Sequence, residues 1–484
     1  MVRRLLLLAV IAVLALVSIL ALRAMQLGGD AQPIGEPAEL EPVDIAGATE
    51  RFAEAIRIAT ISRSADDFER EALVELHQLL ADRFPLTHAT LDREVVGEAS
   101  LLYRWPGRSP ALEPLVLMGH LDVVPAVATD WTHPPFSGFV DDEFIWGRGT
   151  IDNKVNVLGA LEAVEHLLAR GFAPTRTVYL AFGHDEEVGG RGAQAIAQRL
   201  ADANIEPFMI LDEGGLVLRG GMPGVERPVA LLGAAEKGYV SLRLEASGTG
   251  GHSSMPPREH AVGVLARALV ALDEHPMPAR YDGLTADFFG ALAPEMPFSR
   301  RVIFANLWLL EPLVIEALSS IPGTNAMLRT TTAPTMLEGS PKDNILPRSV
   351  SAVVNFRIHP EDRSADVIDH VRRVIDDERV TVEPTSLLSE PATVAPVEGE
   401  AWDALTSAVR TVYSDAILAP SLVVAATDAR HYRRLTDRVY NFTPVVLTED
   451  DLTRIHGVDE RIGIDTYADT IRFYRELIRV VAGG

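Results

Sequence analysis

Histidine and acidic side chains follow the short apolar runs of this sequence, and these are side chains that bind divalent metal ions. Three such runs end near His120, near Glu186 and Glu187, and near Asp212, while Asp152 precedes a segment with apolar residues at helical spacing. Clustered carboxylates repel one another unless a cation neutralises them. Because the chain contains no Cys, His and carboxylate are the expected ligands of a catalytic zinc or related divalent metal.

Two of these motifs have spacings that suit a metal-dependent hydrolase. His120 and Asp122 are two residues apart, so on an extended segment they point to the same side, where the carboxylate can accept from the second imidazole nitrogen. Of the adjacent Glu186 and Glu187, one can bind metal while the other acts as general base. The alternatives are a solvated His-x-Asp turn and two glutamates on a wet surface.

The composition excludes several other classes of protein. The 484 residues include 44 Lys and Arg against 68 Asp and Glu, a net charge of −24, and no block of basic residues, so nucleic acid is not an expected partner. A hydrophobic fraction of 47% is typical of a globular protein. The absence of Cys excludes disulfide scaffolds and thiol catalysis.

Alternating strand and helix patterns predict the sheet that positions these side chains. Apolar runs that end in polar or Gly-rich turns fit buried strands, and they cover residues 114–118, 177–182, 208–211 and 422–425. Helical patterns cover residues 49–58, 71–82 and 155–169. We therefore expect an α/β domain with a mostly parallel sheet and helices on both faces. Ligands of such a sheet bind beyond the carboxyl ends of its strands, which would bring the acidic turns together.

The pattern changes between residues 238 and 357, which predicts a smaller α+β domain inserted into the first. Residues 239–246 and, less regularly, 350–358 alternate as half-exposed strands do, and residues 259–273 form an amphipathic helical pattern. The apolar run 298–315 is interpreted as core of this insertion. The alternatives are an apolar wall for a long acyl chain or side chain and a dimer contact.

The N-terminal segment differs from the rest of the chain. Arg3 and Arg4 precede the run 5–22, in which Ser18 is the only polar side chain, long enough for a bilayer core. The basic flank predicts that the body lies outside the cytoplasm, whether the segment is a retained anchor or a cleaved signal. The predicted divisions are a membrane anchor or signal segment 1–25, a linker 26–47, a catalytic domain 48–237, a lid 238–357 and a second catalytic segment 358–484.

Four motifs of this chain resemble the co-catalytic di-zinc exopeptidases, a family that includes carboxypeptidase S, glutamate carboxypeptidase and the aminoacylases. The motifs are HLDVVP from His120, GRGTIDNK from Gly147, HDEEVGG from His184 and GHSS from Gly251. The resemblance runs from about residue 48 to the C-terminus. The stretch 134–190 looks closest to the branch of carboxypeptidase S and the secreted N-fatty-acyl-amino-acid hydrolases.

The resemblance implies a role for each motif residue. Asp152 would bridge two divalent metal ions, zinc with cobalt or manganese as alternatives, and Glu186 would be the general base beside the bridging water. Asp122 would orient His120. The implied metal ligands are His120, Asp152, Glu187, Asp212 and His456. His431 competes with His456, but it lies in a basic, helix-like run that favours a surface position.

The resemblance also assigns substrate contacts, several of them in the lid. His252 would polarise the scissile carbonyl as an oxyanion-type donor, and in dimeric relatives this His reaches the partner subunit's site. Asn344 and Arg357 would hold substrate, and Arg430 would grip its free carboxylate. Each could instead be structural: His252 a surface loop residue, Arg357 an exposed strand residue, and Arg430 a partner of Asp428 or a helix cap.

The implied reaction is metal-dependent hydrolysis of an amide bond next to a free carboxylate. The substrate is either the C-terminal residue of a peptide or an N-acyl amino acid, and an N-fatty-acyl-amino-acid hydrolase or synthase is the alternative to a peptidase. A membrane-anchored binding protein without catalysis would lack ligands, whereas all five implied ligands and the base are present. A homodimer through the lid and a single-pass location, with the body periplasmic or extracellular, complete these expectations.

Overall fold

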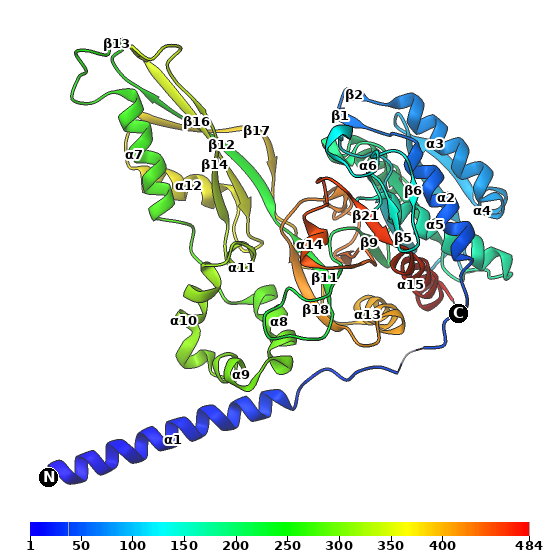
Figure 1. Cartoon of the computed structure of the whole chain (residues 1–484), viewed down its shortest axis with the longest axis horizontal. Coiled ribbons are helices and arrows are strands. Elements are labelled where there is room, and N and C mark those ends of the chain that lie inside the picture. Colours follow the sequence, from blue (N-terminus) through cyan, green and yellow to red (C-terminus); the bar gives the residue numbers. More distant parts are fainter. Residues whose placement is uncertain (37, 484) are drawn as a thin grey trace.

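The computed structural model describes residues 1–36 and 38–483 and contains three parts (Figure 1). A long apolar helix stands at the N-terminus, a larger α/β unit contains both ends of the folded body, and a smaller α+β unit is inserted between them. Pro37, inside the predicted linker, and Gly484 lie outside the described residues.

The larger unit is built on a ten-stranded sheet whose centre is parallel, as predicted. Strand β5 (Leu115–His120) lies between β8 (Val178–Gly183) and β9 (Met209–Asp212) and is parallel to both, and β19 (Val439–Asn441) continues this pattern beside β9. The remaining strands are β3 (Asp92–Val96), β4 (Ser100–Trp105), β10 (Val217–Leu218), β11 (Val229–Glu236), β18 (Ile417–Val423) and β20 (Val446–Leu447).

The flanks of this sheet are mixed, which a mostly parallel sheet allows. Strands β3, β4 and β8 pair antiparallel, and β11 pairs antiparallel with both β10 and β19, while β18 lies parallel to β11. Neighbouring antiparallel strands can be joined by a short hairpin, whereas parallel strands need a longer crossover connection, usually a helix. The sheet is therefore parallel at its centre and mixed at its flanks, where β10 also lies parallel to β20.

Helices cover both faces of the sheet, which explains why every residue of β5 is buried. Leu115 and Leu117 pack in the core toward α5, whereas Val116 and Met118 pack in a separate cluster with residues of α6. The helices of this unit are α2 (Ile45–Arg57), α3 (Arg70–Arg83), α4 (Pro85–Thr90), α5 (Lys154–Ala169), α6 (Arg191–Asp202), α13 (Glu400–Val412), α14 (Glu449–Leu452) and α15 (Ile464–Ala482).

The inserted unit, here called the lid, is a four-stranded antiparallel sheet in the order β14–β16–β12–β17. These strands are β12 (Gly238–Ser247), β14 (Thr331–Glu338), β16 (Ser349–Ile358) and β17 (Val380–Ser389). Helices α7 (Ala261–Glu274) and α12 (Ser364–Ile375) pack on it. The predicted lid boundary at residue 357 is too early, because the chain makes α12 and then returns to add β17 beside β12.

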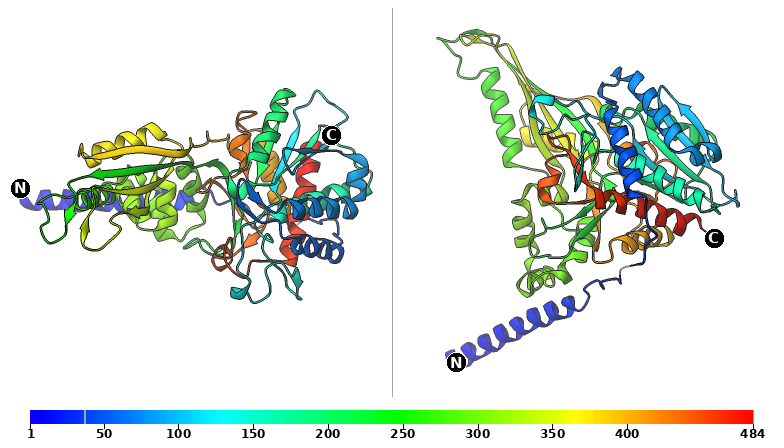
Figure 2. Two further views of the ribbon diagram at one scale, coloured as in Figure 1. Left: turned by 90° about the horizontal axis from the view of Figure 1, so that it is seen from above. Right: turned by 45° about the vertical axis from the view of Figure 1, so that its right-hand side comes forward.

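A helical segment of the lid lies between its sheet and the N-terminal helix (Figures 1 and 2). It contains α8 (Gly283–Leu292), α9 (Phe298–Phe304), α10 (Leu307–Ser319) and α11 (Pro322–Leu328). The N-terminal helix α1 (Val2–Gly28) is long and apolar enough to cross a membrane by length and composition, a test that a signal sequence also passes. Minor pairings are made by β1 (Ser62–Ser64), β2 (Asp67–Phe68), β6 (Phe139–Val140), β7 (Phe144–Trp146) and β21 (Arg461–Gly463).

Candidate metal centre

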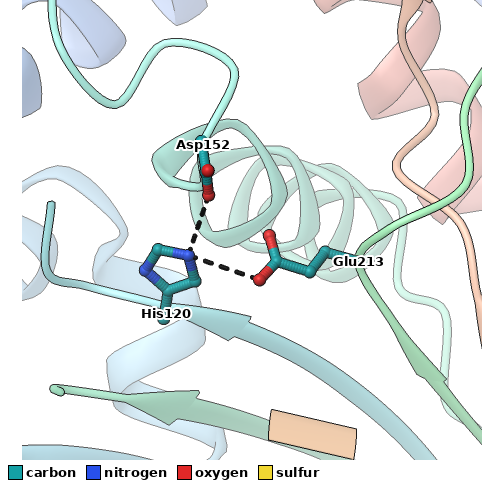
Figure 3. Close-up of side chains that lie close together, drawn as sticks. All are labelled: His120, Asp152 and Glu213. Carbon is teal, nitrogen blue, oxygen red and sulfur yellow. Dashed lines mark hydrogen bonds and ion pairs between the residues drawn. The ribbon is translucent and has the colours of Figure 1, made fainter. Parts of the chain in front are cut away.

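His120 stands at the carboxyl end of β5, and its two ring nitrogens meet different acidic groups. Nδ1 lies 3.0 Å from the backbone O of Asp122 and 3.3 Å from its Oδ1. Nε2 lies 3.0 Å from Oδ1 of Asp152 and 3.4 Å from Oε1 of Glu213. Figure 3 shows this nitrogen facing both carboxylates. Asp122 therefore holds the ring from one side, which leaves Nε2 facing two carboxylates.

Asp152 belongs to two groups of potential metal ligands at once. Its Oδ1 faces His120 and Glu213, and its Oδ2 lies 3.0 Å from Nε2 of His456. The second group is completed by Glu187, whose Oε2 lies 3.1 Å from the same His456 nitrogen. In both groups the ligand atoms lie within 4.8 Å of one another. One carboxylate with one oxygen in each group has the geometry of a bridging ligand.

Asp122 also holds the turn that carries the two glutamates. Its buried carboxylate accepts hydrogen bonds from the backbone N–H of Glu186 (3.1 Å) and of Glu187 (3.3 Å). This turn, η2 (Glu186–Val188), follows β8 directly, so the predicted position of the pair at a strand end is confirmed. A single side chain thus sets the orientation of His120 and the position of both glutamates.

Glu213, and not the predicted Asp212, contributes its carboxylate to the His120 group. The side chain of Asp212 accepts from Oγ1 of Thr427 (2.9 Å) and from the backbone N–H of Ala429 (2.7 Å). The Asn153 side-chain amide donates to Glu213, and its carbonyl accepts from the N–H of His120 at 3.2 Å. Among the described residues, Glu213 and not Asp212 therefore lies in the group that could hold a metal ion with His120.

The alternation of side chains along β9 explains this correction. Ile210 packs in the cluster that contains Ala429, and Leu211 packs in the core toward α5. Successive residues of a strand point to opposite faces. Asp212 therefore continues the face of Ile210 and meets the segment of Thr427, whereas Glu213 continues the face of Leu211 and meets the start of α5.

Glu460 is a second residue that the sequence analysis did not assign. Its buried carboxylate pairs with Arg148 at 2.6 Å and accepts from the backbone N–H groups of Gly149, Ile151 (2.7 Å) and Asp152 (3.1 Å). These bonds connect the segment that bears His456 to the loop that bears Asp152. The only signal in the sequence is its place four residues after His456.

Removal of Arg148 is expected to destabilise the fold, because it leaves the buried Glu460 carboxylate without its counter-charge. Arg148→Met should lower the free energy of unfolding by about 3–5 kcal/mol. The matched control is Arg104→Met, which breaks an exposed pair with Asp92 and should cost at most about 1 kcal/mol. Urea unfolding followed by circular dichroism measures both, and equal midpoints for the two variants would contradict the expected role of Glu460.

The electrostatics of the site fit a cation. Burial raises the pKa of Glu213 to about 7, and burial followed by the charge of Asp428 raises the pKa of Glu186 well above its ordinary value. Burial also raises the pKa of Glu187, and its Oε1 has no hydrogen-bond partner among the described residues although it is buried. Divalent cations would neutralise these carboxylates, and the nitrogen and oxygen donor set is one that zinc and related metals accept.

His456 and Asp152 are instead held in their charged forms by their contacts with each other. Hydrogen bonds to Asp152 and Glu187 raise the pKa of His456 to about 10. Burial alone would raise the pKa of Asp152, but hydrogen bonds from His120 and His456 outweigh it and lower this pKa. In the absence of metal, His456 and Asp152 are joined through a proton. A bound metal ion would take the place of that proton and hold both side chains deprotonated.

The predicted lid residues divide into two places. His252 lies in β13 (Gly251–His252), which pairs with β15 (Ile345–Leu346), and the backbone O of Asn344 accepts from Ser253 at 3.2 Å. Both residues are exposed at the tip of the lid, and Figure 1 shows this tip far from β5 and β9. Within one chain, neither residue joins the metal-ligand groups.

Arg430 belongs to the larger unit itself, and Arg357 lies in the lid strand β16. Arg357 is half-buried near the end of β16, with its guanidinium 5.0 Å from the ring centroid of Tyr239. Arg430 is half-buried in η4 (Asp428–His431). Besides burial, the charge of Asp428, the first residue of this segment, raises the pKa of Glu186. His431, predicted to be a surface residue, is instead half-buried in the same segment, and burial lowers its pKa to about 4.

The chain is similar to several known proteins. Residues 116–480 match the model of the family described as peptidase family M20/M25/M40. A probable carboxypeptidase S-like 2 of Dictyostelium discoideum is 42% identical over 89% of this chain and 84% of its own length. The human N-fatty-acyl-amino acid synthase/hydrolase PM20D1 is 37% identical over 92% of this chain and 89% of its own.

A solved structure has the same fold. The crystal structure of an M20 family metallo-carboxypeptidase, Sso-CP2, from Sulfolobus solfataricus superposes with a TM-score of 0.62. It covers 90% of this chain and 98% of its own length at 18% identity, so this likeness concerns the fold alone.

Proposed function

The chain belongs to peptidase family M20/M25/M40 and is a hydrolase, and on that premise we propose that it cleaves an amide bond next to a free carboxylate. The observation that supports this most directly is Asp152, which offers one oxygen to each of two ligand groups beside Glu186. Its relatives include carboxypeptidase S-like proteins and N-fatty-acyl-amino acid synthase/hydrolases. Peptides and N-acyl amino acids are thus the two substrate classes to be compared.

Two divalent metal ions, zinc in the first instance with cobalt or manganese as alternatives, are proposed for the two groups. His120 and Glu213 would hold one ion, Glu187 and His456 the other, and Asp152 would bridge them. When bound, such ions polarise a carbonyl group and acidify water. Asp122 and Asn153 orient the residues of the first group through the hydrogen bonds described above.

Glu186 is proposed as the general base. It lies next to Glu187 in η2, and its side chain makes no hydrogen bond to another described residue. A carboxylate in this position can take a proton from the attacking water and transfer it to the leaving amine, so that the amide C–N bond breaks without release of an amide anion. Burial raises the pKa of Glu186, which makes its carboxylate a stronger base than an ordinary glutamate.

Arg430 is proposed to bind the free carboxylate of the substrate. Its guanidinium forms no ion pair with a described residue, although the segment around it is buried. A charge-assisted, bidentate pair with a carboxylate would fix the leaving amino acid. Such a local positive charge also opposes the repulsion between an anionic substrate and a chain of net charge −24.

A substrate panel tests this function. N-acyl amino acids with short and long acyl chains, blocked dipeptides, and the corresponding C-terminal amides should be compared with zinc, cobalt and manganese. We expect substrates with a free carboxylate to be hydrolysed at least about 10²-fold faster than the matched C-terminal amides. The amides lack the negative charge that pairs with Arg430. Arg430→Met should remove this preference, and equal rates for acids and amides in the unsubstituted enzyme would contradict the proposal.

A homodimer through the lid is proposed to complete the site. His252 is exposed at the lid tip, with Nδ1 accepting from the backbone N–H of Ser254 at 3.1 Å, and Nε2 has no partner among the described residues. A second copy could place this nitrogen at the scissile carbonyl of the first, where it would stabilise the oxyanion. Asn344 would arrive with it, because β13 and β15 are paired.

Mixing two inactive variants tests whether the site is shared. Glu186→Gln lacks the base and His252→Ala lacks the oxyanion donor, so neither homodimer should turn over substrate. Random exchange of equal amounts should restore about a quarter of the wild-type rate, because half of the dimers contain one intact site of two. A mixture that stays inactive after subunit exchange, with dimers confirmed by light scattering, would show that His252 does not act across the interface.

A membrane location is proposed for the chain, with α1 retained as an anchor. Arg23 Nε donates to the backbone O of Ala305 at 3.0 Å, and Asn306 Nδ2 donates to the backbone O of Leu20 at 3.1 Å. These contacts support a retained helix over a cleaved signal, since they join its last turns to the lid. The body would then lie on the extracytoplasmic side.

A further inference from the structure

Helices α9 and α10 expose an apolar face that the catalytic site does not use. The two helices meet at an angle of 107°. Ile303 of α9 and Trp308, Leu309 and Leu313 of α10 are between 39% and 62% exposed, and Phe298 at the start of α9 is 46% exposed. The run was interpreted from the sequence as core, and in part it is, because Val314 is buried. Phe304 also packs against a buried cluster of the lid, whereas the five exposed residues named above face outward.

This face lies beside the last turns of α1. Asn306, in the bend between α9 and α10, donates to Leu20 of α1, and Arg23 donates to Ala305 in the same bend. Ala24 is fully buried where the two elements meet. Before residue 20, by contrast, all residues of α1 are exposed. Figures 1 and 2 both show α1 projecting from the body beyond α9.

The length of the projecting part matches the thickness of a bilayer core. Residues 2–19 form a free helix of about 27 Å at ~1.5 Å per residue, and a hydrocarbon core is about 30 Å thick. If this part spans the membrane, the bilayer surface falls near Leu20, which is where the bend between α9 and α10 is attached. The exposed apolar face then lies at the boundary between headgroups and acyl chains.

We propose that the α9–α10 face is a second membrane contact, which rests in the interfacial layer of the same bilayer that α1 spans. Trp308 suits this position, because Trp places its apolar ring and its polar N–H at the headgroup level. Glu311 and Glu316 are exposed on α10 beside the apolar residues, and their charges limit the depth to the interface. The inference rests on the proposed anchoring by α1 and is independent of the hydrolase activity.

The absence of Cys allows a direct test in the full-length protein. Single cysteines are introduced by Leu313→Cys on α10, Leu8→Cys on α1 and Val74→Cys on α3, sites that are 62%, 62% and 58% exposed. Each variant is labelled with an environment-sensitive fluorophore and placed in lipid nanodiscs with one chain per disc. Two quenchers are compared, a nitroxide on the lipid chains and an ion soluble in water.

The expected result is lipid quenching at two of the three sites. The labels at Leu8 and at Leu313 should lose roughly half or more of their emission to the lipid nitroxide, and the label at Val74 only to the soluble ion. A label at Leu313 that behaves like the one at Val74, while Leu8 is quenched by lipid, would overturn the proposal. So would a label at Leu313 shielded from both quenchers, which would indicate a protein partner such as a second copy.

The experiment distinguishes a helix α1 that does not span the bilayer from an α9–α10 face that does not contact it. If the label at Leu8 is not quenched by lipid, α1 does not span the bilayer and the proposal falls with it. Circular dichroism of each labelled variant verifies the fold without reference to activity, so these outcomes do not depend on whether the proposed reaction is observed. Leu313 and Val74 are both largely exposed, so neither substitution should disturb the core.

Discussion

Glu186→Gln is expected to lower kcat by about 10²- to 10⁴-fold or more while the metal content stays at the wild-type level. The amide has the shape of the carboxylate but cannot take a proton from water. The side chain of Glu186 makes no hydrogen bond that holds another described residue, whereas its backbone N–H, which the substitution keeps, is bound by Asp122. Initial rates on the preferred substrate and metal analysis of the purified protein measure the two quantities.

The neighbouring Glu187 provides the matched control. Its Oε2 lies within the group formed with Asp152 and His456, so Glu187→Gln should lose metal as well as activity. Both variants remove one charge from adjacent positions of the same turn. A wild-type rate in Glu186→Gln would eliminate it as the base, and equal loss of metal in both variants would move Glu186 into the ligand set.

Glu213→Gln is expected to weaken binding of one metal ion by at least about 100-fold, since loss of an orienting partner alone costs 10- to 100-fold. The matched substitution Asp212→Asn should leave the metal content unchanged. Its retained carbonyl oxygen can still accept from Thr427 and from the Ala429 N–H. Metal titration of the chelator-treated protein, followed by elemental analysis, compares the two variants directly.

The reverse result would restore the sequence-based assignment. If Asp212→Asn lost metal and Glu213→Gln kept it, the orientation of these two adjacent side chains would differ from the one described above. Thermal unfolding with and without added zinc gives a second readout, because a ligand that binds only the folded state raises Tm. The metal-induced rise in Tm should therefore be smaller for Glu213→Gln than for Asp212→Asn.

Much of the larger unit follows from local sequence patterns. The apolar runs at 114–118, 177–182 and 208–211 are strands β5, β8 and β9, and the pattern at 155–169 is helix α5. These segments are strongly periodic or continuously apolar, so their type is set by residues close in the sequence. The mixed flanks of the sheet and the return of β17 to the lid depend on pairing between distant segments, which no local pattern records.

The chemistry of the centre was determined by the sequence, since the residue types and their places after apolar runs predict a His and carboxylate metal site. The tertiary structure decided which of the adjacent residues Asp212 and Glu213 lies beside His120. Asp212 and Glu213 are equivalent in type, and only the pleat of β9 against α5 and the Thr427 segment directs one to His120 and the other away.

The other features of the site depend on contacts between residues that are far apart in the sequence. Glu460 reaches the Asp152 loop across 308 positions, and His252 lies at the lid tip of its own chain. Strand pairing and packing bring such residues together or separate them, through contacts whose partners are remote in the sequence. The sequence therefore determines the donor set, and the register of the folded sheet determines which donors meet.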